Sequence, residues 1–476
     1  MKKNKLKANN LSVNNNITLL VGSIQTVKRF SEKLQFSAIF DSYKKKGRAL
    51  SSLLEALVSY KLTENFSISK VAEWINKPEL LKEFNLKGFE QRTLFRCLET
   101  IGDNSEEILE NLRKVLFLQY SFESTDTVLD WSSLVLYGTA SPLGKRGYSR
   151  DHRPDKEQIT FGVSQLTQPI NVPIGLTICK GNTNDMTHFS KTFNQITPVL
   201  KENSLIVFDK GAHLSQNIEL VKNSNMKYLT AKKLNKSDDK RIKVFDPKKA
   251  TIIDNEDGIY GVKFETPSKF DYLFFSEKLK TEQITARKRK AQRKFEQAKQ
   301  LQDRLDAGKG FPARYKIRNE LIDLSYSYQT KLKELGEERA KKFIENVSLN
   351  GREGFFCLTS SKNLTVNQVL QLYRKKDSIE KTIHSLKNEI EIKPVRVWTT
   401  KSVHGALIIG FLAQLIISLL RYEHEEINTI STKFIKKSLM NLTVTNEKTG
   451  KRSKRRIYSN FDVINTVICC QNRAIS

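Results

Sequence analysis

The spacing of hydrophobic and polar residues predicts a helical segment that extends to about Phe122. Apolar residues recur at helical intervals, and polar or glycine-containing links separate the stretches SISKVAEWI, EQRTLFRCLETIG and SEEILENLRKVLF. Short helices with basic faces are typical of a helix-turn-helix domain that reads DNA. A plain helical packing domain gives the same pattern. Residues 1–122 are therefore predicted as a helical N-terminal domain, with DNA binding as its candidate role.

From Ser124 the hydrophobic period changes from that of helices to that of strands. Three strands in an antiparallel meander are predicted at TVLDWSSLVLY, QITFGVSQL and VPIGLTICKG. They are followed by a helix across NDMTHFSKTFNQITPVL, a strand at SLIVFDKG, a helix over SQNIELVKNS and a strand at KYLTAK. This order predicts an α/β fold whose mixed sheet has helices on its faces, with residues 123–231 as its first part.

Residues 232–354 predict an insertion of β strands and basic helices into this sheet domain. The stretches GIYGVKFE and FDYLFFSEK predict paired strands. A long basic helix from Thr281 to Gly308 and a further helix around Arg318 to Leu335 are expected after them. The strand GFFCLTS then returns the chain to the sheet domain. Its second part is predicted at residues 355–425, before a basic C-terminal segment at residues 426–476.

The composition points to a folded protein with a polyanionic partner. The chain has 476 residues, 38% of them hydrophobic, which is enough for two or three domains with a sizeable core. Its formal net charge of +29 at pH 7 far exceeds what solubility needs. Basic residues cluster in several places, among them YKKKGR, ARKRKAQRK and KRSKRR. DNA, RNA or an anionic membrane surface would satisfy this charge.

The cysteines and the hydropathy of the chain indicate in which compartment the protein works and whether it binds a membrane. The five cysteines show neither metal-ligand spacing nor a disulfide framework, which indicates a reducing, cytoplasmic environment. The only long apolar run extends from Gly405 to Leu420 and contains Gln414. It is shorter than a membrane span, so a fully buried helix is expected and no membrane partner.

The segment from Leu372 to Ile390 predicts a helix with charged and phenolic side chains beside its buried face. An α-helix turns about 100° per residue, which places Tyr373, Lys376, Glu380 and Lys387 within an arc of about 60°. A compact apolar stripe lies next to this arc and comprises Leu372, Ile379, Ile383, Leu386 and Ile390. The helix would therefore dock by one stripe and expose a carboxylate, two ammonium groups and a phenol along its margin.

Two further acids lie where acids are unusual. Asp130 interrupts an apolar strand, and Asp209 follows the apolar run LIVF at the carboxyl end of its strand. A carboxylate in such a place is costly unless it is paired or coordinated. Asp126, at the start of the first strand, is a weaker rival to Asp130. For Asp209 alone, a hydrogen bond to the following turn is an equally good explanation.

Together with Glu380, these acids could form one site with hard oxygen ligands. Three carboxylates that converge without a cluster of Cys or His favour Mg²⁺ or Mn²⁺. Two such ions about 4 Å apart would clamp the attacking and leaving oxygens of a phosphodiester displacement. On a strongly basic protein, this chemistry indicates the cutting or joining of nucleic acid strands.

These residues resemble the DDE transposases of prokaryotic insertion sequences, in the group with the signature Y-x2-R-x3-E-x6-K. Tyr373, Glu380 and Lys387 stand in register with the signature, and Lys376 occupies the place where the family usually has Arg. Asp130 in DWSS resembles the first acidic motif of the family, and Asp209 in FDKGAH resembles the second. Further resemblance lies in GYSRDHRPDKEQITFGV, VPIGLTICKGNTNDMTHF and KPVRVWTTKSVHGALIIGFLAQLI, so that the match extends to Leu420.

The resemblance implies a ribonuclease H-like fold interrupted by an insertion, and a metal-dependent mechanism. Asp130, Asp209 and Glu380 would be catalytic and would bind two Mg²⁺ ions, for which Mn²⁺ could substitute. Tyr373, Lys376 and Lys387 would hold DNA phosphates near the scissile bond. The implied partners are double-stranded DNA, both as element ends and as target, and a second copy of the chain in a synaptic homodimer. The implied location is cytoplasmic, on the nucleoid when the protein is bound to DNA.

Two other functions remain open for this sequence. One is a non-catalytic transposase relic or repressor that binds terminal repeats, and the other is a ribonuclease H-like nuclease without strand transfer. The presence of all three acidic positions argues against a relic. Trp398 also has two interpretations: it could stack on an unpaired base, but a buried aromatic leading into the apolar helix is the preferred one.

Overall fold

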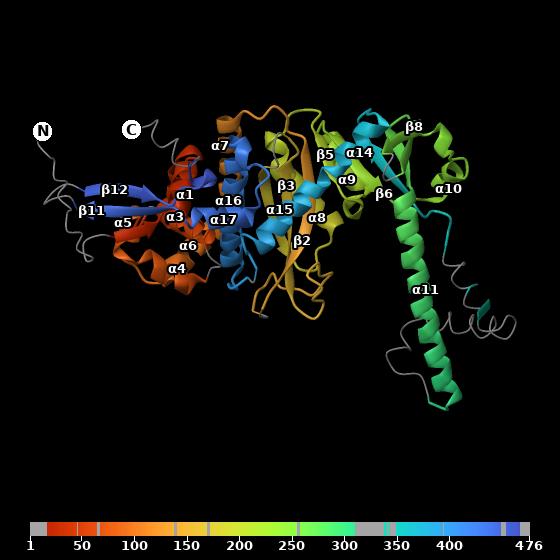
Figure 1. Ribbon diagram of the computed structural model, residues 1–476, viewed down its shortest axis with the longest axis horizontal. Helices are drawn as coiled ribbons and strands as arrows, with labels where there is room; N and C mark the ends of the chain where they lie inside the picture. The colour runs from red at the N-terminus through yellow and green to blue at the C-terminus, as the bar shows by residue number, and fades with distance from the viewer. Residues whose placement is uncertain are drawn as a thin grey trace, which may run out of the picture. The chain divides into compact units, whose positions relative to one another are not determined.

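The computed structural model describes most of the chain, in two compact units. The described residues are 17–44, 46–63, 67–137, 140–168, 172–254, 258–309, 338–339, 342, 349–393, 395–448 and 454–466. The first unit comprises Met1–Tyr228 with Arg374–Ser476, and the insertion unit comprises Leu229–Tyr373 (Figure 1). The helix predicted around residues 318–335 lies outside the described residues.

The N-terminal part of the first unit is helical, as the hydrophobic period predicts. Its helices are α1 (Gly22–Lys33), α2 (Phe36–Phe40), α3 (Leu50–Lys61), α4 (Ile68–Ile75), α5 (Pro78–Glu83), α6 (Arg92–Asp103) and α7 (Ser105–Tyr120), with a 3₁₀ turn η1 (Asp41–Tyr43). The Ser67 hydroxyl caps α4 by accepting from the Lys70 amide. Helix α5 begins with Pro78, whose missing amide hydrogen costs nothing at that position.

A small sheet that the hydrophobic pattern does not predict joins segments from both ends of the chain. Strand β1 (Ile17–Leu20) pairs antiparallel with β11 (Thr443–Lys448), which pairs with β12 (Lys454–Ser459). The buried residues Val21, Leu442 and Val444 form its core. The pattern misses this hairpin because its strands are short and carry many charged residues.

The main sheet of the first unit is mixed, in agreement with the predicted order. Strand β2 (Thr127–Val135) pairs antiparallel with β3 (Gln158–Leu166) and parallel with β5 (Leu205–Phe208), and β3 pairs antiparallel with β4 (Pro173–Lys180). Every residue of β3 and β5 is buried. The accompanying helices are α8 (Asp185–Ile196) and α9 (Ser215–Asn223), with 3₁₀ turns η2 (Thr197–Val199) and η3 (Lys210–Ala212). This unit is therefore an α/β structure in which helices flank a mixed sheet.

The predicted continuous helix from Leu372 to Ile390 is interrupted at Lys375. Helix α14 (Val366–Arg374) ends there and α15 (Lys376–Asn388) begins after it. Neither glycine nor proline marks the interruption, so no local sequence signal predicts it. The apolar stripe is confirmed within α15 and just after it, because Ile379, Ile383, Leu386 and Ile390 are buried.

The rest of the first unit is built on one long apolar helix. After α15 come α16 (Thr400–Glu423), the 3₁₀ turn η6 (Glu425–Ile427) and α17 (Thr432–Leu439). Helix α16 is the one helix in the described part of the chain long and apolar enough to cross a membrane, and 89% of its apolar window is buried inside the protein. This burial confirms the expectation of a core helix.

Two glycines allow α16 to approach α6 very closely. A Cβ atom at Gly405 would lie 2.1 Å from the carbonyl oxygen of Leu98, and one at Gly102 would lie 1.8 Å from the carbonyl oxygen of Lys401. Both obstacles are backbone atoms, which cannot rotate away as a side chain could. The crossing of these two helices therefore requires glycine on each side.

The insertion unit is an antiparallel sheet with helices. Strand β6 (Lys227–Lys232) begins in the first unit and ends in this one, where it pairs with β10 (Phe355–Ser360). Strand β10 pairs with β9 (Lys269–Ser276), β9 with β8 (Ile259–Thr266), and β8 with β7 (Thr251–Asp254). The helices are α10 (Lys236–Lys243), α11 (Glu277–Asp306) and α14, with the 3₁₀ turn η4 (Pro247–Lys249). Helix α11 corresponds to the predicted long basic helix.

The close crossing of α6 and α16 predicts that Gly405→Ala destabilises the protein. The added methyl group meets the backbone of Leu98, so the helices must separate, at a cost of about 1–3 kcal/mol. Urea unfolding followed by circular dichroism measures this cost. Gly88→Ala is the control, since its Cβ would meet nothing closer than 3.7 Å and its effect should stay within about 0.5 kcal/mol. Equal stability of both variants would contradict the close-packing argument.

Candidate active site

Asp130 lies in the middle of the main sheet of the first unit. It belongs to β2, between the buried residues Leu129 and Trp131. Burial raises the pKa of the Asp130 carboxyl to about 6, even though the positive charges of Lys376 and Arg150 act to lower it. The carboxyl group therefore sits in an environment that disfavours its charge unless a cation is close.

Asp209 lies level with Asp130 on the neighbouring strand. Leu129 of β2 and Phe208 of β5 are partners in the parallel register, so Asp130 and Asp209 are the next residues on adjacent backbones. Adjacent strands lie about 4.8 Å apart. Asp209 is partly buried and precedes η3, with its carbonyl oxygen accepting from the Ala212 amide at 3.0 Å. The strand pairing thus brings together two carboxylates that are distant in sequence.

Glu380 is linked to Asp130 and Asp209 by Lys376, a residue on the same helix that interacts with all three acids. The Nζ atom of Lys376 lies 2.7 Å from Oε1 of Glu380, one turn away on α15. Burial tends to lower the pKa of Lys376, but the negative charges of Asp130, Glu380 and Asp209 outweigh it and raise the pKa above its usual value. One ammonium group therefore interacts with all three carboxylates. We call Asp130, Asp209, Glu380 and Lys376 the carboxylate site.

The donor chemistry of the carboxylate site fits a hard divalent cation, although its present arrangement holds a lysine. Carboxylate oxygens are the ligands that Mg²⁺ and Mn²⁺ prefer. Across the residues that the structure describes, no group of three or more His, Cys, Asp or Glu side chains is placed to hold a metal ion. The Lys376 ammonium group engages one oxygen of Glu380, Oε1, in this structure.

Lys387, which the helical wheel places beside Glu380, is buried and fully engaged. Its Nζ atom lies 2.7 Å from Oδ1 of Asp151 and donates to the carbonyl oxygen of Ser133 at 2.9 Å. Only 8% of its side chain is exposed. Because Ser133 belongs to β2, these contacts fasten α15 to the strand that carries Asp130. A second link is the hydrogen bond from Nε2 of Gln165 in β3 to Oγ of Ser378.

Tyr373 falls on the other side of the helix interruption. It is the penultimate residue of α14 and belongs to the insertion unit, whereas Lys376, Glu380 and Lys387 belong to the first unit. Tyr373 would share one helical face with these residues only if the helix were uninterrupted. The shared face is therefore confined to the part of the signature that lies within α15.

The sequence singles out neither Arg150, which interacts with Asp130, nor Asp151, which pairs with Lys387. The Arg150 guanidinium pairs with Asp185 at 2.7 Å, and its backbone amide donates to the Ser133 hydroxyl at 3.0 Å. Both residues lie in an irregular segment between β2 and β3 that has no hydrophobic period. The segment belongs to the stretch GYSRDHRPDKEQITFGV, which carries part of the family resemblance, but nothing in that stretch distinguishes these two residues. Asp126, the rival to Asp130, accepts from the Leu205 amide at 2.7 Å and ties β2 to β5.

The preferred interpretation of Trp398 is wrong. Its side chain is 52% exposed, and Tyr137 is 69% exposed. Both residues line a cavity of about 490 Å³ together with Leu136 and Val395, whose backbones form a parallel bridge. The sequence favours burial because Trp398 precedes an apolar helix, but the helix begins only at Thr400 and turns its apolar residues elsewhere.

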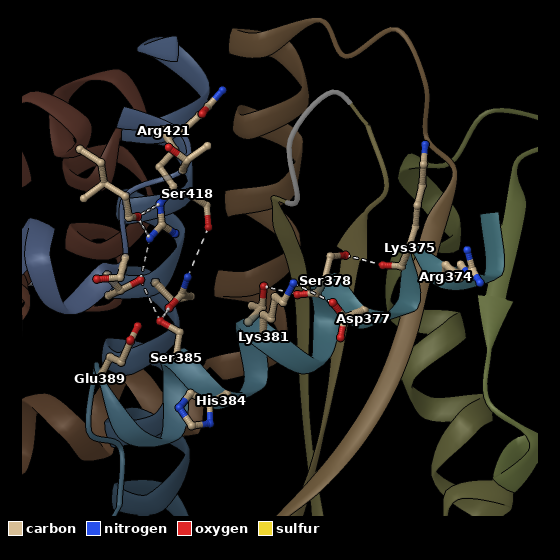
Figure 2. A pocket seen from close by; sticks show the side chains of 17 residues that line it. Arg374, Lys375, Asp377, Ser378, Lys381, His384, Ser385, Glu389, Ser418 and Arg421 are labelled. Atoms are coloured by element: carbon tan, nitrogen blue, oxygen red, sulfur yellow. Dashed lines mark hydrogen bonds and ion pairs between the residues drawn. The ribbon is translucent and has the colours of Figure 1, made fainter. Parts of the chain in front are cut away.

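A polar cavity of about 520 Å³ lies on another face of α15 (Figure 2). Its floor is a buried hydrogen-bond network in which the Ser385 hydroxyl contacts both Gln414 and Thr432 at 2.9 Å. Lys381 and Arg421 are among the basic residues that line it. Gln414, which makes the apolar run of α16 unusual, is thus explained by this network.

Comparisons with known proteins place the chain in a family. Among solved structures, the chain is similar to the piggyBac transposase in its synaptic complex with hairpin DNA, with a TM-score of 0.40 and 10% sequence identity, over 89% of this chain and 79% of that chain. No curated protein matches the chain. The family described as Transposase DDE domain matches residues 121–416, which include Asp130, Asp209 and Glu380. The chain belongs to the family of proteins with a transposase DDE domain.

Proposed function

We propose that this protein is a transposase of the insertion-sequence type that binds the ends of a mobile DNA element, cleaves them and transfers the freed strand into target DNA. The observation that carries the proposal is the carboxylate site, in which acids from β2, from the end of β5 and from α15 interact with one ammonium group. Membership of the DDE family supports the same reaction class. We assign the sheet around β2 to a ribonuclease H-like fold on this basis.

The three carboxylates are the groups that would hold divalent metal in this reaction. Asp130 and Asp209 lie side by side on paired strands, and Glu380 adds a third donor from α15. Bound Mg²⁺ or Mn²⁺ would polarise the scissile phosphodiester and activate water and then the 3′ hydroxyl. The charge of +29 supplies the attraction for double-stranded DNA. Because two element ends must meet, a homodimer is the proposed active form, acting in the cytoplasm on the nucleoid.

Lys376 and Lys387 have different roles in this proposal. Lys376 lies within the carboxylate site and would contact a DNA phosphate there, and Tyr373 would add a second phosphate contact. The contacts of Lys387 favour a positioning role, because its ammonium group is buried against Asp151 and the backbone of β2. It would keep Glu380 in register with Asp130.

The proposed reaction predicts that Asp130→Asn and Glu380→Gln abolish cleavage without abolishing DNA binding. Each change removes one metal-binding charge, which should lower the cleavage rate by about 100-fold or more. The substrate is labelled DNA that carries the inverted repeats flanking the gene, incubated with Mg²⁺ and a target plasmid. Electrophoretic mobility shift measures binding in the same samples.

Asp377→Asn is the matched control for these variants. Asp377 lies on α15 near Glu380, is 64% exposed and pairs only with the exposed Lys381 among its described ion pairs. This variant should cleave at the wild-type rate. A wild-type protein that binds the repeats but never cuts them would instead identify a non-catalytic binder. Cleavage without joining to the plasmid would identify a simple nuclease.

The positioning role predicts that Lys387→Met destabilises the protein. The Asp151 side chain is 15% exposed, so removal of Lys387 leaves a largely buried carboxylate whose other described ion pair, with Lys393, is longer at 3.7 Å. The expected loss is about 3 kcal/mol, measured by urea unfolding. Lys381→Met is the control, because its pair with Asp377 is exposed and worth less than about 1 kcal/mol. The double variant Lys387→Met/Asp151→Asn should recover part of the loss. An unchanged stability would show that Lys387 acts only on DNA.

A further inference from the structure

We propose that Lys376 is the resident cation of the carboxylate site and competes with divalent metal for Glu380, so that metal loads tightly only when a DNA phosphate draws the lysine away. This inference rests on the proposed function, since it concerns the same three carboxylates. It assigns Lys376 a second role besides phosphate contact: it links metal binding to DNA binding.

The exposure of the two charged groups in this pair is unlike that of an ordinary surface pair. The side chain of Lys376 is 12% exposed, whereas that of Glu380 is 57% exposed. The pair Asp377–Lys381 on the same helix has the same spacing and the same N–O distance of 2.7 Å, but its side chains are 64% and 76% exposed (Figure 2). Lys376 is therefore drawn into the protein by something other than Glu380.

The carboxylates of the sheet supply that attraction. Lys376 interacts electrostatically with Asp130 and Asp209 as well as with Glu380. The negative charges of Asp130, Asp209 and Glu380 repel one another, and this repulsion is weakly screened where the site is partly buried. The Lys376 ammonium offsets part of this charge, and Arg150 also interacts with Asp130. In the absence of other cations, Lys376 thus stabilises the arrangement.

The same contacts make Lys376 an obstacle to metal. A divalent ion needs Glu380 oxygens as ligands, and Oε1 of Glu380 is bonded to the ammonium group. Metal binding through both oxygens of Glu380 therefore requires Lys376 to move. Its flexible four-carbon stem and compact charge permit this movement, whereas the rigid fork of an arginine would hold a carboxylate more firmly.

A DNA phosphate would provide the alternative partner for the displaced ammonium group. DNA then raises the affinity for metal, and by thermodynamic reciprocity metal raises the affinity for DNA by the same factor. The protein would consequently hold little metal at this site until DNA arrives. Such coupling limits hydrolysis away from the element ends.

The test measures Mn²⁺ binding to the full-length protein by isothermal titration calorimetry, with electron paramagnetic resonance of free Mn²⁺ as a second readout. Without DNA, Lys376→Met and the polar variant Lys376→Gln should bind Mn²⁺ about tenfold more tightly than wild type. The control Lys381→Met, which removes the exposed lysine of the matched pair, should bind as wild type does. Addition of an uncleavable DNA duplex should tighten Mn²⁺ binding to wild type by a similar factor and leave the Lys376 variants nearly unchanged.

The outcomes separate this inference from the proposed function. If folded Lys376→Met and Lys376→Gln proteins bind Mn²⁺ no more tightly than wild type, the competition is refuted, even when wild-type cleavage depends on Glu380. If DNA strengthens Mn²⁺ binding equally in wild type and in the Lys376 variants, the link through Lys376 is also refuted. If wild type with DNA binds no Mn²⁺ and Glu380→Gln cleaves normally, the metal site itself is wrong and both proposals fail.

Discussion

The electrostatic balance between one ammonium group and three carboxylates is the constraint around which the first unit is organised. Negative charge at Asp130 on β2, with Asp209 just after β5 beside it, is costly in a partly buried place unless a cation is close. Lys376 supplies that cation from α15, so the position of this helix against the sheet is part of the electrostatics of the site. Any displacement of α15 removes both the compensating charge and the third carboxylate. The helix must therefore be held firmly.

Contacts at both ends and in the middle of α15 meet this requirement. Ser378 and Lys387 bond to the sheet, and two buried lysines bond to the backbone at the end of the helix and just beyond it. Lys436 donates to the Glu389 carbonyl oxygen at 2.7 Å, and Lys61 from the helical N-terminal part donates to the Glu391 carbonyl oxygen at 2.6 Å. Carbonyl groups at a helix end attract cations. Burial lowers the pKa of Lys61 to about 7, and the neighbouring positive charge of Lys436 acts in the same direction.

The sequence predicts the strands of the main sheet and the helices beside them well because their signals are local, whereas it misses the small sheet of β1, β11 and β12. Asp130 and Asp209 stand out as acids at apolar strands, and the stripe from Ile379 to Ile390 fixes the buried face of α15. The partner of Lys387 could not be predicted in the same way. Asp151 lies more than 200 residues earlier in an irregular segment, and no period in the sequence connects the two. The break between the helices at Lys375 also has no signal in the sequence, since the chain there contains neither glycine nor proline.

The choice of lysine at position 376 matters for the strength of the bond to Glu380 as well as for the charge of the site. The signature that this sequence resembles usually has arginine at this position, which would also place a positive charge beside the carboxylates. A guanidinium group binds a carboxylate through two parallel hydrogen bonds, while the lysine here makes one hydrogen bond to Oε1 of Glu380. One bond is easier to exchange for a phosphate than two. Lysine consequently keeps the charge that stabilises the metal-free site while it lowers the barrier to releasing Glu380, and the departure from the signature is compatible with a working active site.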